Sequence, residues 1–185
     1  MRFKYQYKPE GEDPHNFSCQ LQCNRCTATN KSGAQCKNRV CIGTTVCHAH
    51  RKQLGLRVKK SEIPNAGKGL FATRKFKRGE IIGQYGGEVI SGAEVTNRYS
   101  AGTAPYTLKI GANRYLDSAC KRTLMSTANS KRARTRNNAK FSGTPTANNK
   151  INVRATKTIQ PGSEIYAFYG DGYWNTVADT KHTTK

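Results

Sequence analysis

Residues 159–174 read Ile-Gln-Pro-Gly-Ser-Glu-Ile-Tyr-Ala-Phe-Tyr-Gly-Asp-Gly-Tyr-Trp, the most informative segment of this 185-residue chain. A Pro-Gly turn precedes an apolar run over Glu164–Phe168, which predicts a short strand. The aromatic residues of the segment suit either an apolar channel or ordinary β-core packing; they are Tyr166, Phe168, Tyr169, Tyr173 and Trp174.

A second informative stretch is residues 63–72, which read Ile-Pro-Asn-Ala-Gly-Lys-Gly-Leu-Phe-Ala. Gly-Glu-Ile-Ile follows at 79–82 and Tyr-Gly-Gly-Glu at 85–88. A Gly-x-Gly sequence alone is typical of a hairpin turn, because glycine adopts positive φ without strain. Only in combination with the later segment does it carry information about function.

Between and around these stretches the chain alternates short β-type runs with glycine, which predicts a mainly β domain of small sheets. Gly111–Asn113 is expected to form a hairpin turn, and the only expected helices are short, near Ala93–Tyr99 and Lys121–Thr127. The expected strands are Leu56–Lys60, Gly69–Ala72, Glu80–Tyr85, Glu88–Ile90, Tyr106–Ile110, Arg114–Asp117, Ile151–Ala155 and Glu164–Phe168.

Taken in series, these motifs resemble the SET-domain protein-lysine methyltransferases, particularly the short forms of viruses and protists. The resemblance covers about residues 57–174. It implies a β-clip of several small sheets in which the end of the chain threads through a preceding loop. It also implies S-adenosylmethionine as cofactor and a lysine side chain as methyl acceptor.

The resemblance assigns a cofactor site as well. The Gly-x-Gly backbone would hold the amino-acid end of S-adenosylmethionine, where the main chain must approach the ligand closely. The family's Asn-His pair, on the adenine side, falls on an Asn-Ser pair here. The residues assigned in this way are Gly67, Lys68, Gly69, Tyr106, Asn129, Ser130, Tyr169 and Trp174.

Tyr169 matches the catalytic tyrosine of the family, whose hydroxyl would position the amine. Ala167 stands where the family has an aromatic residue that limits methylation, so we expect di- or trimethylation to be allowed. The family's next asparagine is expected at Asn138, after a longer gap than usual. No cysteine follows Cys120, so the zinc module that often closes the family's site is absent from this sequence.

Six of the seven cysteines lie within residues 19–47, and their spacing predicts a structural zinc knuckle over residues 22–52. With few large apolar residues, this segment would need a metal to fold. We expect the zinc ligands to be Cys26, Cys36, Cys47 and His50, with Cys23 and Cys41 as substitutes. Free thiols in a tail, or a disulfide framework, are the alternatives.

Lys and Arg number 32 against 11 Asp and Glu, a net charge of +21, which makes polyanions the first partners to consider. Ten of these basic residues, and no acidic one, lie between Asp117 and Glu164. Unless the loop at 130–140 is merely solvated, we expect it to contact DNA or nucleosomes together with the zinc knuckle. No apolar run is long enough for a membrane span, and no signal peptide is expected.

The sequence therefore predicts a histone or other protein-lysine methyltransferase inside the cell, at chromatin in the nucleus or, for a virus, in the host nucleus or viral factory. The alternatives are a catalytically weak SET-like module that binds chromatin or DNA, and a zinc-knuckle nucleic-acid chaperone. Residues 1–21 are expected to form an N-terminal tail, 56–174 the SET domain and 175–185 a C-terminal tail.

Overall fold

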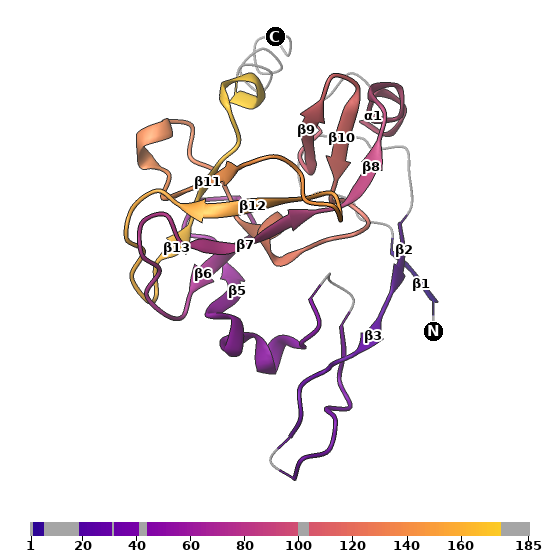
Figure 1. Ribbon diagram of the computed structural model, residues 1–185, viewed down its shortest axis with the longest axis vertical. Helices are drawn as coiled ribbons and strands as arrows, with labels where there is room; N and C mark the ends of the chain where they lie inside the picture. Colours follow the sequence, from indigo (N-terminus) through magenta and orange to yellow (C-terminus); the bar gives the residue numbers. More distant parts are fainter. Residues whose placement is uncertain (1, 6–18, 31, 41–43, 100–103, 175–185) are drawn as a thin grey trace.

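The computed structural model describes residues 2–5, 19–30, 32–40, 44–99 and 104–174. Most of the ordered elements are short strands, as the sequence predicts, and they form several small sheets (Figure 1). In strand order these sheets are β1-β2, β3-β4, β13-β6-β5, β14-β11-β12-β7 and β8-β10-β9.

The largest sheet and its neighbour enclose the main core. The four-stranded sheet contains β7 (Ile81–Gly86), β11 (Ala139–Ser142), β12 (Lys150–Ala155) and β14 (Ala167–Phe168). The adjacent three-stranded sheet contains β5 (Leu56–Lys60), β6 (Lys68–Ala72) and β13 (Glu164–Ile165). Apolar side chains from both sheets meet in one cluster, whose most buried members include Leu70, Phe76, Leu116, Val153, Ile159 and Ile165.

The segment 164–168 joins the two sheets, and the sequence predicts it as a single strand. In the structure β13 pairs antiparallel with β6, and β14 pairs parallel with β11. The change of partner falls at Tyr166, where Asn138 holds the backbone: its Oδ1 accepts from the Tyr166 amide at 2.8 Å and its Nδ2 donates to the Glu164 carbonyl at 2.8 Å. Asn138, expected from the motif, thus fixes this crossover.

The third sheet carries α1 (Gly92–Tyr99), the longest α-helix of the described residues. It is made of β8 (Glu88–Ile90), β9 (Thr107–Gly111) and β10 (Arg114–Asp117), with the predicted hairpin between the last two. Ser91 caps α1, because its hydroxyl accepts from the Glu94 amide at 3.2 Å. The 3-10 helices η2 (Leu124–Thr127) and η3 (Arg134–Arg136) follow β10.

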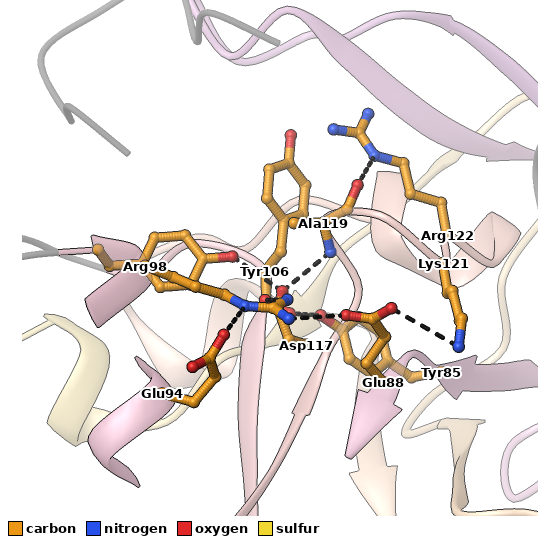
Figure 2. Close-up of polar contacts among 10 residues, drawn as sticks. Tyr85, Glu88, Glu94, Arg98, Tyr106, Asp117, Ala119, Lys121 and Arg122 are labelled. Carbon is orange, nitrogen blue, oxygen red and sulfur yellow. Dashed lines mark hydrogen bonds and ion pairs between the residues drawn. The ribbon is translucent and has the colours of Figure 1, made fainter. Parts of the chain in front are cut away.

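An ion-pair network fastens α1 to this sheet (Figure 2). Arg98 pairs with Glu94 on its own helix at 2.9 Å, with Glu88 on β8 at 2.9 Å and with Asp117 on β10 at 2.8 Å. Asp117 is fully buried and also accepts from the Tyr99 hydroxyl at 2.8 Å. The helix is therefore held mainly by charge-assisted hydrogen bonds.

The N-terminal part forms a separate projection below the main body (Figure 1). It comprises the pair β3 (Asn24–Arg25) and β4 (Arg39–Val40), followed by η1 (His48–Leu54). β1 (Arg2–Tyr5) pairs with β2 (Cys19–Gln22), so a strand pair lies within the stretch expected as a tail. The expected C-terminal tail, 175–185, lies outside the described residues.

Candidate functional site

A small pocket opens beside the aromatic segment at the end of the described chain. Its walls come from the β9 region, η2, β7, β11 and the segment after β14, and are mostly apolar or aromatic. The lining residues are Tyr85, Pro105, Thr107, Leu108, Met125, Ser126, Ala128, Phe141, Tyr169 and Tyr173. Ligand pockets are typically lined in this way, mostly by apolar and aromatic side chains with a few polar groups.

Tyr169 provides a hydroxyl group to the pocket and is hydrogen-bonded to residues near the end of η2. Its hydroxyl donates to the Ala128 carbonyl at 2.8 Å, and its amide donates to the Ser130 hydroxyl at 3.2 Å. Burial is the main cause that raises the pKa of Tyr169, with added repulsion from the nearby Tyr173 and Tyr106 phenols. The side chain is therefore a neutral phenol at physiological pH. Its own proton is bonded to Ala128, so the oxygen lone pairs remain to accept.

Two aromatic residues that follow Tyr169, Tyr173 and Trp174, form consecutive ring contacts that begin at its ring. The Tyr169 and Tyr173 rings meet edge to face with centroids 5.0 Å apart, and Tyr173 meets Trp174 in the same way at 5.2 Å. Such edge-to-face contacts stabilise a fixed arrangement of rings. Trp174 thus packs on Tyr173, and it supports the pocket without lining it.

Another wall of the pocket is formed by Tyr85, which belongs to the Tyr-Gly-Gly-Glu motif at 85–88. Its ring meets Phe141 edge to face at 5.3 Å, and its hydroxyl donates to the Tyr106 carbonyl (Figure 2). The second contact holds the chain at 105–108 against the pocket. The Tyr106 ring itself stacks under the Arg122 guanidinium, 4.6 Å from its centroid. Neither Tyr85 nor Phe141 has a local signal that marks it as a pocket wall.

Ala167 does not line this pocket. Its side chain is fully buried in the core, where it pairs with Ala139 across β14 and β11. Among the described residues, the aromatic side chains that line the pocket are Tyr85, Phe141, Tyr169 and Tyr173. The expectation that Ala167 allows di- or trimethylation therefore has no support from the pocket wall.

The predicted glycine turn lies at the start of β6 and is open on one side. Gly67 has φ +63°, and a Cβ placed there meets nothing within 4 Å. Asn129 is brought to the same turn, because its Nδ2 donates to the Lys68 carbonyl at 3.1 Å. Open space over a glycine backbone, beside a carboxamide, fits the amino-acid end of S-adenosylmethionine.

Ser130 connects this region to Tyr169. Its hydroxyl is buried and accepts from the Tyr169 amide, so the residue that replaces the family's histidine links the Asn-Ser pair to the tyrosine. Next to it, Asn137 closes the basic loop: the Lys131 amide donates to Asn137 Oδ1 at 2.8 Å, and Asn137 Nδ2 donates to the Lys131 carbonyl at 2.8 Å. The loop is therefore preformed, with the side chains of 132–136 exposed.

The four residues expected to bind zinc converge in the N-terminal projection. Their ligand atoms all lie within 4.8 Å of one another. His50 Nδ1 is 3.6 Å from Cys26 Sγ and 3.3 Å from Cys47 Sγ, and the sulfurs of Cys36 and Cys47 are 4.0 Å apart. In a tetrahedral zinc site sulfur atoms lie roughly 3.8 Å apart. The donors and their spacing thus fit a Zn²⁺ ion.

One backbone donor and one side-chain donor reach sulfur atoms of this cluster. The Cys47 amide donates to Cys26 Sγ at 3.2 Å, and Asn38 Nδ2 donates to Cys47 Sγ at 3.4 Å. Chiefly because of the Asn38 contact, the pKa of Cys47 falls to about 6. This second layer of hydrogen bonds resembles the support that metal ligands usually have.

Of the two proposed substitutes, Cys23 does not enter this cluster. Cys23 is disulfide-bonded, so its sulfur is not a ligand, and Cys120 is disulfide-bonded as well. Cys41 lies outside the described residues. The described cysteines therefore fall into two groups: Cys23 and Cys120 are disulfide-bonded, whereas Cys26, Cys36 and Cys47 are free thiols beside His50. The metal and disulfide interpretations were alternatives in the sequence analysis; the structure shows disulfide-bonded Cys23 and Cys120 beside a separate Cys/His cluster whose donors fit a metal ion.

The fold, the pocket and the glycine turn together define a SET domain. The sequence model of the SET-domain family matches residues 67–170, more than half of the chain, and the protein belongs to that family. No curated protein matches the chain. Within the described residues, no helix is both long and apolar enough for a transmembrane span.

Solved structures agree with this assignment. A humanized mutant of the Chaetomium thermophilum Polycomb Repressive Complex 2 bound to the inhibitor GSK126 is 25% identical, with a TM-score of 0.56 over 66% of this chain and 16% of that one. A structure of ctPRC2 in complex with H3K27me3 and H3K27M is 25% identical, with a TM-score of 0.55 over 63% and 14%. The methyltransferase domain of human PR domain-containing protein 2, at 19% identity, shows a similar fold with a TM-score of 0.51 over 63% and 77%. The chain thus spans about a seventh of the polycomb chains.

Proposed function

We propose that this protein is a protein-lysine N-methyltransferase that transfers a methyl group from S-adenosylmethionine to a lysine side chain, with histones as substrate. The observation that carries the proposal is the neutral Tyr169 phenol, fixed by Ala128 and Ser130 in an aromatic pocket. The family and the polycomb neighbours, one of which was solved with H3K27me3, support this choice of reaction and substrate.

A lysine must lose its proton before it can accept a methyl group. A free lysine has a pKa of ~10.4, so forming the neutral amine at pH 7 costs about 4.6 kcal/mol. The apolar walls of the pocket reduce this cost, because burial disfavours the ammonium more than the amine. Walls such as Leu108, Met125 and Phe141 would contact the methylene chain of the lysine.

Tyr169 would orient the amine. Its hydroxyl proton is bonded to the Ala128 carbonyl, so its lone pair can accept from an amine N–H and direct the nitrogen lone pair. A neutral phenol whose pKa is raised is a poor base, so its part is alignment rather than proton removal. Alignment of this kind contributes much of the rate in a bimolecular transfer.

The cofactor, when bound, supplies an electrophilic methyl group on a sulfonium. The residues we propose to hold it are the Gly67–Gly69 turn and Asn129, with Tyr106, Ser130, Tyr169 and Trp174 around them. Gly67 leaves the space, and the Lys68 carbonyl and Asn129 amide are already joined beside it. The zinc ion we propose at the Cys26–His50 cluster would be structural, because four protein ligands leave no open position.

The deciding experiment is methyl transfer from radiolabelled S-adenosylmethionine to nucleosomes, free histones and the protein itself. We expect label in a histone lysine and a loss of about 100-fold in kcat for Tyr169→Phe, because the amine loses its alignment. Mass spectrometry of the product identifies the methylation state.

The matched control is Tyr115→Phe, a tyrosine of β10 that does not line the pocket. It should retain the activity of the natural protein. Transfer that is unchanged in Tyr169→Phe would contradict the proposed role of the phenol. Absence of both cofactor binding and methyl transfer in the natural protein would instead favour the alternative, a catalytically weak module that binds chromatin.

We also propose that the protein contacts DNA beside its substrate, which would place it at chromatin. The preformed loop closed by Asn137 presents Arg132, Arg134 and Arg136 on its exposed side. A rigid loop loses little conformational entropy when it binds phosphate groups. This arrangement would reconcile a strongly basic enzyme with a basic histone tail, because DNA lies between the like charges.

A further inference from the structure

Glu164 is a buried acid, 1% exposed, that accepts hydrogen bonds on both oxygens. The Ser61 hydroxyl donates to Oε1 and the Glu62 amide to Oε2, each at 2.7 Å. Asn129 Nδ2 adds a bond to Oε1 at 3.1 Å and the Tyr166 hydroxyl one to Oε2 at 3.0 Å. Both oxygens of Glu164 act only as acceptors, as the oxygens of an ionised carboxylate do. None of the four donors carries a positive charge.

The carboxylate also explains one glycine of the cofactor turn. A Cβ on Gly69 would lie 2.1 Å from Glu164 Oε1, so any larger residue would displace the acid. A Cβ on Gly67 would meet nothing within 4 Å. The two glycines therefore have different roles: Gly67 leaves the outer face of the turn open, and Gly69 admits Glu164 on the inner face.

Glu164 further determines which way Asn129 faces. The Asn129 nitrogen has two hydrogens and three acceptors within reach, the Glu164 carboxylate, the Ser61 hydroxyl at 3.0 Å and the Lys68 carbonyl at 3.1 Å, so one N–H is shared between two of them. A flipped carboxamide would place its oxygen against a carboxylate oxygen and a carbonyl oxygen, which is repulsive. The acid thus fixes the amide and, through it, the carbonyl of the turn.

We propose that Glu164 is a positioning residue for the amino-acid end of S-adenosylmethionine, an inference that rests on the proposed function. It holds Asn129 and the Gly67–Gly69 turn in the conformation that would bind the ligand. It also places a negative charge, not neutralised by its four donors, behind the turn that would receive the ligand's ammonium group. Opposite charges attract strongly where water is excluded.

The test compares three ligands by calorimetry on the natural protein and on Glu164→Gln, which keeps the size of the side chain and removes its charge and one of its two acceptor oxygens. S-adenosylmethionine and S-adenosylhomocysteine carry the amino-acid end, whereas 5′-methylthioadenosine lacks it. We expect the variant to bind the first two roughly tenfold more weakly and the third within about twofold of the natural protein. A merely structural role would weaken all three alike.

Glu80→Gln is the matched control, because it removes the same charge from a surface acid paired with Arg74. It should bind all three ligands normally. Equal losses for the three ligands, or none, in Glu164→Gln would overturn the inference while leaving the proposed function intact. A natural protein that binds none of them overturns both. If Glu164→Gln does not fold, the second variant is Ser61→Ala, which removes one donor to Oε1. It should show the same ligand selectivity with a smaller loss of affinity.

Discussion

At the scale of single residues, two buried acids illustrate different ways of stabilising a charge. Glu164 is held by four neutral donors, whereas Asp117 pairs with the largely buried Arg98. Asp117 also accepts from the Ala119 amide at 2.9 Å, which turns the chain after β10. Removing either acid takes a buried acceptor away from its donors, and the loss is more costly where one of the donors is a cation.

Asp117→Asn should therefore destabilise the protein by about 2–3 kcal/mol, because Arg98 loses its buried partner but retains Glu88 and Glu94. Urea unfolding followed by intrinsic fluorescence measures the change. The control, Glu80→Gln, disrupts the exposed pair with Arg74 and should cost less than about 1 kcal/mol. Equal effects of the two substitutions would show that the network does not stabilise the fold.

At the scale of elements, strand positions follow from the sequence better than strand partners do. Leu56–Lys60 and Arg114–Asp117 form strands within the predicted bounds. Ala139–Ser142 was missed because it directly follows the basic loop and has few apolar residues. The predicted strand at 164–168 divides at Tyr166, because its two halves pair with different sheets. The alternation of apolar and polar residues along a strand specifies which face of the sheet each side chain lies on, but not which strands pair with each other.

The N-terminal projection provides a second prediction at this scale. His50 and His48 both lie in η1, but only His50 lies in the cluster with the three cysteines. His50→Asn should lower the zinc content, measured by mass spectrometry of the metal, and weaken the folding of this projection. His48→Asn, an exposed neighbour, should retain one zinc per chain. Loss of metal from both variants, or from neither, would contradict the proposed ligand set.

The same cluster predicts a pH dependence. The pKa of Cys47 is lowered from 9.0 to about 6 in the folded protein, mainly by Asn38. A lowered folded pKa means that the thiolate stabilises the fold, fully above pH 9.0 and less as the pH falls through about 6. With the metal chelated, the projection should therefore exchange amide hydrogens faster at pH 5.5 than at pH 8 after correction for the intrinsic rate. Asn38→Ala should reduce this difference; an unchanged difference would contradict the assigned cause.

At the scale of the whole molecule, charge is the dominant property. The net charge of +21 comes from 32 basic and 11 acidic residues, and three of those acids are gathered in the network around Arg98. The basic loop at 130–136 is consequently not neutralised locally. A potential of this sign attracts polyanions over distances longer than a single contact.

DNA binding should weaken steeply with salt and should depend on this loop. Replacing Arg132, Arg134 and Arg136 by alanine should reduce the slope of log affinity against log salt by about three, close to one per lost phosphate contact. Fluorescence anisotropy of a labelled duplex measures it. The control removes three exposed basic residues of the β6–β7 turn, Lys75, Lys77 and Arg78, and should change the slope less. Equal changes, or a flat salt response in the natural protein, would contradict a specific role for the loop.

The sequence by itself determined the family, the positions of most strands after residue 55 and the candidate catalytic tyrosine, because those depend on motifs that are local in the chain. Only the tertiary structure decided which residues wall the pocket, why Gly69 must be glycine and which carboxylate holds Asn129. Ser61 and Glu164 are 103 positions apart, and Tyr169 and Ala128 are 41 apart. Contacts over such separations arise from how the sheets pack, and no local pattern of residues encodes them.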